Sequence, residues 1–456
     1  MLKELSIQNF KAWESTGPIR LAPLTIFCGT NSSGKSSLAQ FLLMLKQTVE
    51  SSDRQRVLHL GDKDTIEDLG TFNEIIFQHN EKLPLGFEVK FESSPVEFTD
   101  AKSGKKYGPY TQINFGATIL QNQRNQRITL EEFHYKLVNG NSTTFSFKTS
   151  GTGYQLGSSN YNLVKRRMRP WDLPAPENFY GFPDEVIAYY QNTGFLPDLT
   201  LAIKNLFKSI YYVGPLRNNP QRQYIFSGEI PQDVGVNGDK TINAILSAAD
   251  RKIAPQANKR AEKFDALVAR WLKQMNLIDS FRVVPIAKGR KEYEVKVRIK
   301  NDSSEVLIAD VGFGISQVLP VLVQSFYVPN NSILLFEQPE IHLHPSVQAH
   351  LGDMFIEAIH SRENKESKHT QILVESHSEH LIRRIQRRIA EDILPKDDVA
   401  IYFISQKNGK SNIEELKLDL FGNITNWPDN FFGNDLEDLT AMTKAAINRK
   451  KKKINA

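Results

Sequence analysis

The sequence has little cysteine and no long apolar run. Its single cysteine, Cys28, leaves no partner for an internal disulfide, which fits a reducing cytosol. No run of about 18 apolar residues is present, so we expect no membrane span. The first residues, Met1–Glu4, lack a signal-peptide pattern. These absences predict a cytoplasmic protein that makes no membrane contact.

The sequence also has little excess charge. The net charge is +5, and the run Arg449–Lys453 alone carries five positive charges. Without that run the balance is near neutral, which excludes a strongly basic nucleic-acid-binding body. We interpret the run as a solvated tail, with a phosphate or partner contact as the alternative.

The length of 456 residues predicts two lobes, or one domain with a large insertion. Apolar and polar residues alternate repeatedly between about 70 and 150, which predicts an antiparallel sheet. Further along, prolines and helical patterns predict a mainly helical insertion without a long coiled-coil arm. The sequence therefore predicts an α/β chain of four parts. The first half of the fold, with the antiparallel sheet, covers residues 1–160, and the helical insertion covers 161–280. The second half covers 281–400, and a short segment with the basic tail covers 401–456.

A glycine-rich loop lies between a predicted strand and a predicted helix. Residues 24–28 form a short apolar run typical of a buried strand, and apolar residues recur with helical spacing from 37 to 49. Between them, Gly29–Ser36 matches the pattern G-x-x-x-x-G-K-[ST]. Lys35 of such a loop would reach the β- and γ-phosphates, and the Ser36 hydroxyl would bind Mg²⁺. We therefore predict an ATP site formed by Asn31, Ser33, Gly34, Lys35, Ser36 and Ser37.

A second buried strand ends in acidic residues. Glu337 follows four apolar residues, where a carboxylate would hold nucleotide-bound Mg²⁺ together with Ser36. The next position normally carries the glutamate that takes a proton from the attacking water, but Gln338 can only orient a water. Either hydrolysis is slow, or another group such as Glu340 or His344 serves. The alternative for Glu340 is a structural role.

Two glycines and a serine precede another predicted helix. This segment, Gly312–Gln317, forms a second candidate anion site, about 20 residues before the acidic strand. Its place in the order of motifs is that of an ABC signature, which contacts a γ-phosphate held by a partner subunit. By itself the segment could be a glycine-rich helix cap. The predicted contacts are Gly312, Gly314 and Ser316.

Histidines follow both of the later strands. His377 comes after the apolar run 371–374, where a histidine suits a γ-phosphate sensor. The alternative is a helix cap by Ser378 with an incidental histidine. His342 and His344 are poor evidence for a metal site, because they are two residues apart with no cysteine nearby.

Together, these segments resemble the ABC-type ATPases of the SMC, RecF and OLD (overcoming-lysogenization-defect) group, over residues 1–50 and 305–385. The resemblance implies an ABC-type P-loop NTPase head, a mixed sheet with helices. It also implies a homodimer or higher oligomer that sandwiches ATP and Mg²⁺ between subunits. Lys35, Ser36 and Glu337 would then act from one subunit and the Gly312 segment from the other, with His377 sensing the γ-phosphate.

A narrower resemblance links the chain to a bacterial subfamily of predicted ATPases, through Gly214–Arg217 and Asn426–Phe432. That subfamily often has glutamine at position 338. OLD proteins usually carry a C-terminal TOPRIM nuclease, but its D-x-D pair is missing after His377, so we expect no built-in nuclease.

Relatives without a nuclease commonly sit beside a separate effector, often a nuclease, in bacterial antiphage systems. By this analogy the chain is an ATP-gated sensor or scaffold of a defence complex. The alternative is a DNA-repair or chromosome-maintenance ATPase that clamps DNA directly, like RecF or SMC. A transporter ATPase is disfavoured, because the acidic motif and the N-terminus do not fit one.

Overall fold

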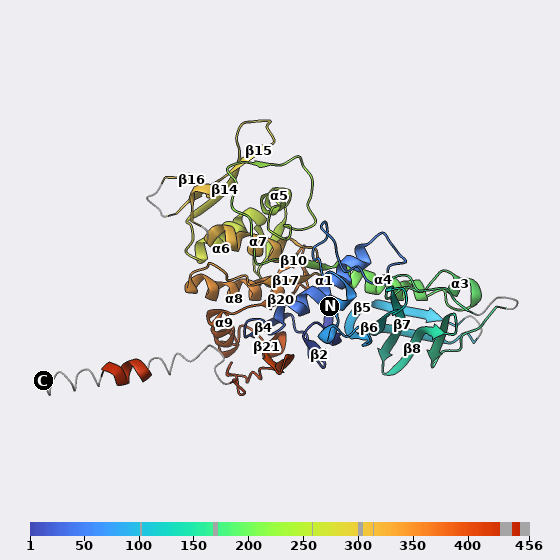
Figure 1. Ribbon diagram of the computed structural model, residues 1–456. Coiled ribbons are helices and arrows are strands. Elements are labelled where there is room, and N and C mark those ends of the chain that lie inside the picture. The colour runs from blue at the N-terminus through green and yellow to red at the C-terminus, as the bar shows by residue number, and fades with distance from the viewer. Residues whose placement is uncertain are drawn as a thin grey trace.

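A computed structural model gives the architecture of the chain (Figure 1). Among the residues that the structure describes, there are two large sheets, one of six strands and one of eight, and two further sheets of four strands each. The structure describes residues 1–100, 103–166, 172–257, 259–299, 304–312, 314–428 and 440–446.

The six-stranded sheet forms the centre of the molecule. Its first five strands run parallel, and the sixth returns antiparallel as a hairpin. The three strands from β17 to β4 are buried almost throughout, which explains why they are short, nearly continuous apolar runs. In spatial order the strands are β10 (Ile210–Val213), β17 (Ile333–Glu337), β20 (Gln371–Glu375), β4 (Leu24–Gly29), β21 (Val399–Lys407) and β22 (Lys410–Glu415).

Alternate residues of the central sheet face two separate hydrophobic cores. In β17, Leu335 belongs to one core and Leu334 to the other. The first core contains α1 (Lys35–Glu50) and α4 (Leu196–Lys208). The second contains α7 (Gly314–Tyr327), α8 (Pro345–His360) and α9 (Glu379–Ala390). The helix after the glycine loop and the helix after Gly312 therefore cover opposite faces of the sheet (Figure 1).

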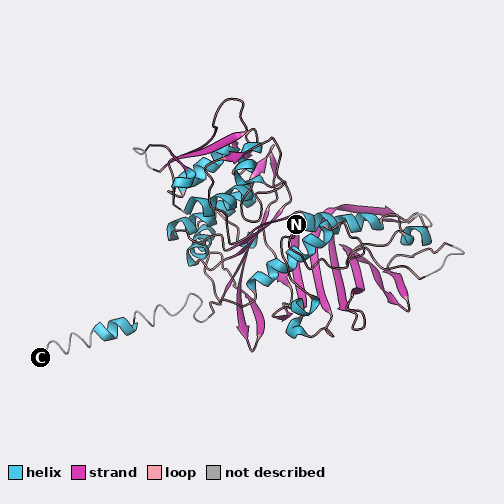
Figure 2. Ribbon diagram, turned by 45° about the horizontal axis from the view of Figure 1, so that its top comes forward, coloured by secondary structure: helices cyan, strands magenta, loops and turns pink. Residues whose placement is uncertain are grey.

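The eight-stranded sheet confirms the antiparallel sheet predicted from the alternation. Phe115, Phe133, Phe145 and Phe147 are fully buried on its inner face, and Figure 2 shows its long strands side by side. The short helix α2 (Phe72–Ile75) precedes the sheet's longest strands. The strands are β1 (Leu2–Phe10), β2 (Trp13–Ser15), β3 (Ile19–Arg20), β5 (Leu85–Thr99), β6 (Lys106–Gln121), β7 (Ile128–Asn139), β8 (Asn141–Ser150) and β9 (Gly153–Ser159).

The segment 161–280, predicted as a mainly helical insertion, is divided between the two halves of the fold. Its helices are α3 (Glu185–Tyr189), α4, α5 (Thr241–Ser247) and α6 (Phe264–Gln274). Between α4 and α5, however, β10 enters the central sheet and pairs in parallel with β17. Four residues are too short a run to show a strand period, so the sequence pattern did not distinguish this strand from helix or loop. The domain boundaries themselves stay a prediction.

In the described part of the chain, the two small sheets both contact α6. The helix predicted after the Gly312–Gln317 segment is confirmed as α7, and the strand β15 (Glu292–Arg298) belongs to one of these small sheets. No helix of the described residues is long and apolar enough to cross a membrane. The run 449–453 and the motif residues 429–432 lie outside the described residues. The remaining strands are β11 (Tyr224–Ile225), β12 (Lys252–Ala254), β13 (Glu262–Lys263), β14 (Ser280–Pro285), β16 (Val306–Leu307), β18 (Arg362–Glu363) and β19 (Glu366–Ser367).

Candidate functional site

The glycine loop turns sharply from β4 into α1, and close contacts require glycine at both of its ends. Gly29 has φ +144°, and a Cβ on it would lie 1.9 Å from the carbonyl oxygen of Ile404 in β21. Gly34 has φ +97° just before α1, and a Cβ there would lie 2.5 Å from the Ser411 hydroxyl. Any side chain at these two positions would push the loop away from its neighbours.

Neighbouring strands hold the loop through its carbonyl groups. The Ser411 hydroxyl of β22 donates to the Ser33 carbonyl at 2.6 Å, and the Trp13 indole donates to the Gly34 carbonyl at 3.2 Å. The Ser37 hydroxyl also donates to Gly34, at 2.7 Å, so Ser37 closes the first turn of the helix. An anion-binding loop uses its backbone N–H groups, so bonds to its carbonyls fix its shape without competing with the anion.

Lys35 and Ser36 lie at the inner side of the loop. The Lys35 ammonium donates to the carbonyls of Thr30, at 2.6 Å, and Gly29, at 3.3 Å. Burial lowers the pKa of Lys35, and the nearby Glu375 carboxylate opposes that shift. The Ser36 hydroxyl donates to the same carboxylate. Asn31, also predicted to bind nucleotide, is exposed at the loop's outer turn.

Two buried glutamates stand side by side at the ends of neighbouring strands. Glu337 ends β17 and is 9% exposed, whereas Glu375 ends β20 and is 6% exposed, and the two are register partners. Burial first, and then the Glu375 charge, raise the pKa of Glu337 to about 8. Burial likewise raises the pKa of Glu375. Within the described part of the chain, Glu337 Oε1 and Glu375 Oε2 have no hydrogen-bond partner.

Glu375 was not among the residues predicted from the sequence. Its signal was nevertheless present, because it directly follows the apolar run 371–374, just as Glu337 follows the run before it. The parallel sheet then brings both strand ends to the edge where the glycine loop lies, which is where ligands bind in open α/β sheets.

Glu340 is tied to the segment that follows β20. One of its oxygens accepts a hydrogen bond from the His377 backbone N–H at 2.6 Å, and the Ser376 hydroxyl donates to the same carboxylate. Burial raises the pKa of the Glu340 carboxyl. These contacts favour the structural alternative for Glu340, because the carboxylate positions the turn that carries His377.

His377 and Gln338 lie beside the two glutamates. Burial, and then the Lys35 ammonium, lower the pKa of His377, so the imidazole is close to the loop lysine. The Ser378 hydroxyl caps α9 by accepting from Leu381 N–H at 3.1 Å, so the predicted cap exists next to the histidine. Gln338 has φ +42°, and its N–H donates to the Glu375 carbonyl at 2.9 Å.

His344 does not join this group. Its Nδ1 is 2.8 Å from the Ser346 hydroxyl, and it caps the start of α8. No cluster of three or more histidine, cysteine, aspartate or glutamate side chains that could hold a metal is found in the described ranges. In this structure His344 caps α8, and its role as a proton acceptor in hydrolysis stays a prediction.

Arg217, in the Gly214–Arg217 motif, forms hydrogen bonds with the backbone at the acidic end of β17. Its Nη2 donates to the backbone carbonyls of Glu337 at 3.0 Å and Gln338 at 3.4 Å. Burial lowers the pKa of Arg217 to about 10, and the Glu340 carboxylate opposes the shift. As far as the described residues show, its Nε and Nη1 have no hydrogen-bond partner. From the sequence, this arginine was identified only as part of a motif, and no role was predicted for it.

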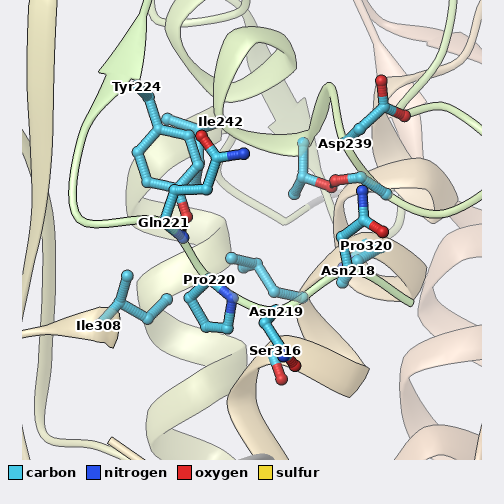
Figure 3. Close-up of a pocket in the computed structure, with 13 residues that line it drawn as sticks. Asn218, Asn219, Pro220, Gln221, Tyr224, Asp239, Ile242, Ile308, Ser316 and Pro320 are labelled. Atoms are coloured by element: carbon cyan, nitrogen blue, oxygen red, sulfur yellow. Dashed lines mark hydrogen bonds between the residues drawn. The ribbon is translucent and has the colours of Figure 1, made fainter. Parts of the chain in front are cut away.

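The Gly312 segment leads into α7, which packs in the other hydrophobic core from α1. Gly312 is exposed and a Cβ on it would meet nothing within 4 Å, while Gly314 begins α7. Ser316 is buried, and it lines a small pocket together with the segment 218–221 that follows Arg217 (Figure 3). Of the three predicted contacts, the two glycines are therefore accessible at the helix start, and the serine points into the protein.

The loop, its lysine and serine, and the acidic strand ends define a P-loop nucleotide-binding protein of the α/β class. A family model described as "AAA ATPase domain" matches residues 1–163 and 219–382, and the chain belongs to this family. A second model, described as "Protein of unknown function (DUF3696)", matches residues 394–442. No curated protein sequence matches the chain. The predicted α/β fold and the ATPase class are confirmed, and the narrower SMC, RecF and OLD grouping stays a prediction.

Among solved structures, similarity is found to SMC head domains. The SMC head domain from Thermotoga maritima has 13% identity and a TM-score of 0.40, covering 91% of this chain and 99% of that one. An Smc head with an extended coiled coil, bound to the C-terminal domain of ScpA derived from Pyrococcus furiosus, has 10% identity and a TM-score of 0.37, covering 91% and 96%. An SmcHead bound to the C-winged helix domain of ScpA has 13% identity and a TM-score of 0.40, covering 91% and 98%.

Proposed function

We propose that the chain binds Mg²⁺ and ATP at Gly29–Ser36 and hydrolyses the nucleotide. The observation that carries the proposal is the convergence of Lys35, Ser36 and two buried carboxylates at one edge of the parallel sheet. A lysine at the start of a helix, behind a glycine turn, suits the phosphates of a nucleoside triphosphate. His377, close to Lys35, is the proposed sensor of the γ-phosphate.

The donor set fits a hard cation. Carboxylate and hydroxyl oxygens are the ligands that Mg²⁺ prefers, and Glu337 offers a buried oxygen without a partner among the described residues. Ser36 and Glu337 are the proposed ligands. When bound, the metal would neutralise charge that develops on the phosphate oxygens. Lys35 would hold the phosphates, and Gln338 would orient the attacking water.

Hydrolysis itself is tested by phosphate release from ATP by the full chain and by Ser36→Ala. We expect slow release by the wild type and a loss of at least about tenfold in the variant, because Ser36 supports the metal. ATP that neither binds nor is hydrolysed would overturn the proposal. Gln338→Glu supplies the missing proton acceptor, so it should change turnover, and unchanged turnover would show that Gln338 does not limit hydrolysis.

We also propose a nucleotide-dependent homodimer, in which the exposed start of α7 meets the partner's γ-phosphate. Gly312→Asp places a negative charge at this helix start without a clash. Gly194→Asp is a matched control, since a Cβ on Gly194 also meets nothing within 4 Å. Light scattering should show a dimer with ATP for the wild type and the control, and a monomer for Gly312→Asp. Equal masses for all three in ATP would contradict this arrangement.

Control of a separate effector nuclease in a defence complex is the proposed cellular role, and it rests on analogy to the resembled group. The direct DNA clamp is the alternative. A pull-down with the product of the adjacent gene, with and without ATP, tests the first. Strong, salt-sensitive stimulation of ATP hydrolysis by bare duplex DNA would instead favour the second.

A further inference from the structure

The carboxylates of the candidate metal site are divided between two strands. Glu337 ends β17 and Glu375 ends β20, and β20 lies between β17 and the loop strand β4. Glu375 is the register partner of Phe27, two residues before Gly29. Glu375 is therefore one strand closer to the loop in the sheet than Glu337 is.

The contacts of Glu375 are with the loop itself. The Ser36 hydroxyl donates to its carboxylate, and the Lys35 ammonium provides the opposing charge. Its other oxygen, Oε2, is buried, and no partner for it exists among the residues that the structure describes. A buried carboxylate oxygen without a partner costs free energy, so a cation or donor that binds there is favoured.

Glu337, on the neighbouring strand, also has one buried carboxylate oxygen without a partner among the described residues. The Tyr212 hydroxyl bonds one of its oxygens, while Oε1 is left without a partner in the described part of the chain. Arg217 does not neutralise this carboxylate, because its Nη2 donates to the backbone carbonyls of Glu337 and Gln338. Two adjacent carboxylates thus each keep a buried oxygen available, and one of them, Glu375, contacts Ser36.

We propose that Glu375 is a second carboxylate of the magnesium site, joining Glu337 and Ser36 around the metal that accompanies ATP. This role differs from that of the proton acceptor missing at Gln338, because Glu375 would bind the metal rather than take a proton from water. The inference rests on the proposed ATP binding at Gly29–Ser36. It assigns to Glu375 a role toward the metal, whereas a merely structural glutamate would only fix Ser36.

The two roles predict different effects of Mg²⁺. A carboxylate beside the phosphates repels ATP when no metal is present and attracts the metal–nucleotide complex when it is. Glu375→Gln keeps the size and the hydrogen bond to Ser36 but removes the charge. Its ATP affinity should therefore stay equal or rise in EDTA, while the Mg²⁺ concentration for half-maximal tight binding rises about tenfold or more.

The experiment is calorimetric titration of ATP into the full chain, in EDTA and over a series of Mg²⁺ concentrations. Glu337→Gln is the positive comparison, and Glu379→Gln is the matched control on the surface of α9. Glu375→Asp, which keeps the charge, should recover part of the Mg²⁺ dependence. This second variant keeps the test valid if Glu375→Gln folds poorly.

A Mg²⁺ midpoint for Glu375→Gln within about twofold of the wild type would overturn the inference, while wild-type ATP binding would leave the proposed function standing. Equal weakening in EDTA and in Mg²⁺ would also overturn it, because that is the result of a purely structural role. No ATP binding by the folded wild type would instead refute the proposed function, and with it the inference.

Discussion

The contact between Glu340 and the turn after β20 gives a quantitative prediction. Its carboxylate accepts from the His377 N–H at 2.6 Å and from the Ser376 hydroxyl, away from solvent. A hydrogen bond to a charged group contributes about 1.5–3 kcal/mol and one to a neutral group about 0.5–1.5 kcal/mol, so the two bonds that the Gln oxygen can still accept become weaker. Removal of the charge also relieves some desolvation, so we take the lower end. Glu340→Gln should lower the free energy of unfolding by about 1.5 kcal/mol.

The assay is equilibrium unfolding in urea, with Glu379→Gln as the control. Glu379 pairs with Arg383 on the surface of α9, and such a pair contributes no more than about 0.5 kcal/mol. The same substitution should therefore have a clear effect at one site and almost none at the other. The reasoning would be refuted if Glu340→Gln were as stable as the wild type but hydrolysed ATP about a hundredfold more slowly. Glu340 would then act on the attacking water.

Three further predictions concern the loop and the far end of the fold. Gly29→Ala should cost about 2 kcal/mol or more in urea unfolding, because its φ is strained and its Cβ would lie 1.9 Å from Ile404 O; an unchanged midpoint would refute the close approach. Ser411→Ala removes the 2.6 Å bond to the loop carbonyl, so stability should fall by about 1 kcal/mol and ATP affinity several-fold, with unchanged values for both as the contrary result. Burial lowers the pKa of Lys368 to about 8 from 10.5, so the unfolded chain binds more protons between these values, and stability should rise with pH across that window. Lys368→Met should remove this rise of up to about 3 kcal/mol, whereas the exposed Lys365→Met should keep it; equal pH profiles for the two variants would contradict the assignment.

The sequence predicted those parts of the fold whose signal is local. The glycine pattern at Gly29–Ser36 requires a particular backbone, and the apolar runs before it and before Glu337 show strands buried on both faces. By contrast, β10 is four residues long, so only its pairing with β17 reveals that it is a strand. Local patterns were thus sufficient for the loop and insufficient for the sheet order.

The candidate site was predicted only in part, because local sequence patterns mark some of its residues and not others. Lys35, Ser36 and Glu337 lie within recognisable motifs, and the structure brings them to one sheet edge. Glu375 and Arg217 act through contacts with residues far from them in sequence. The apolar run 371–374 marks Glu375 as a strand end, but its contact with Ser36, like the contacts of Arg217, depends on strand order, which no pattern along the chain contains.

The central claim is that Mg²⁺ and ATP bind at the glycine loop, and a direct binding titration tests it. Lys90→Ala, which breaks a surface pair with Glu4 on the antiparallel sheet, is the control for Lys35→Ala. We expect the wild type and Lys90→Ala to bind one ATP per chain with equal affinity, and Lys35→Ala to bind about a hundredfold more weakly, a loss of about 2.7 kcal/mol. Unchanged affinity in Lys35→Ala would contradict the account.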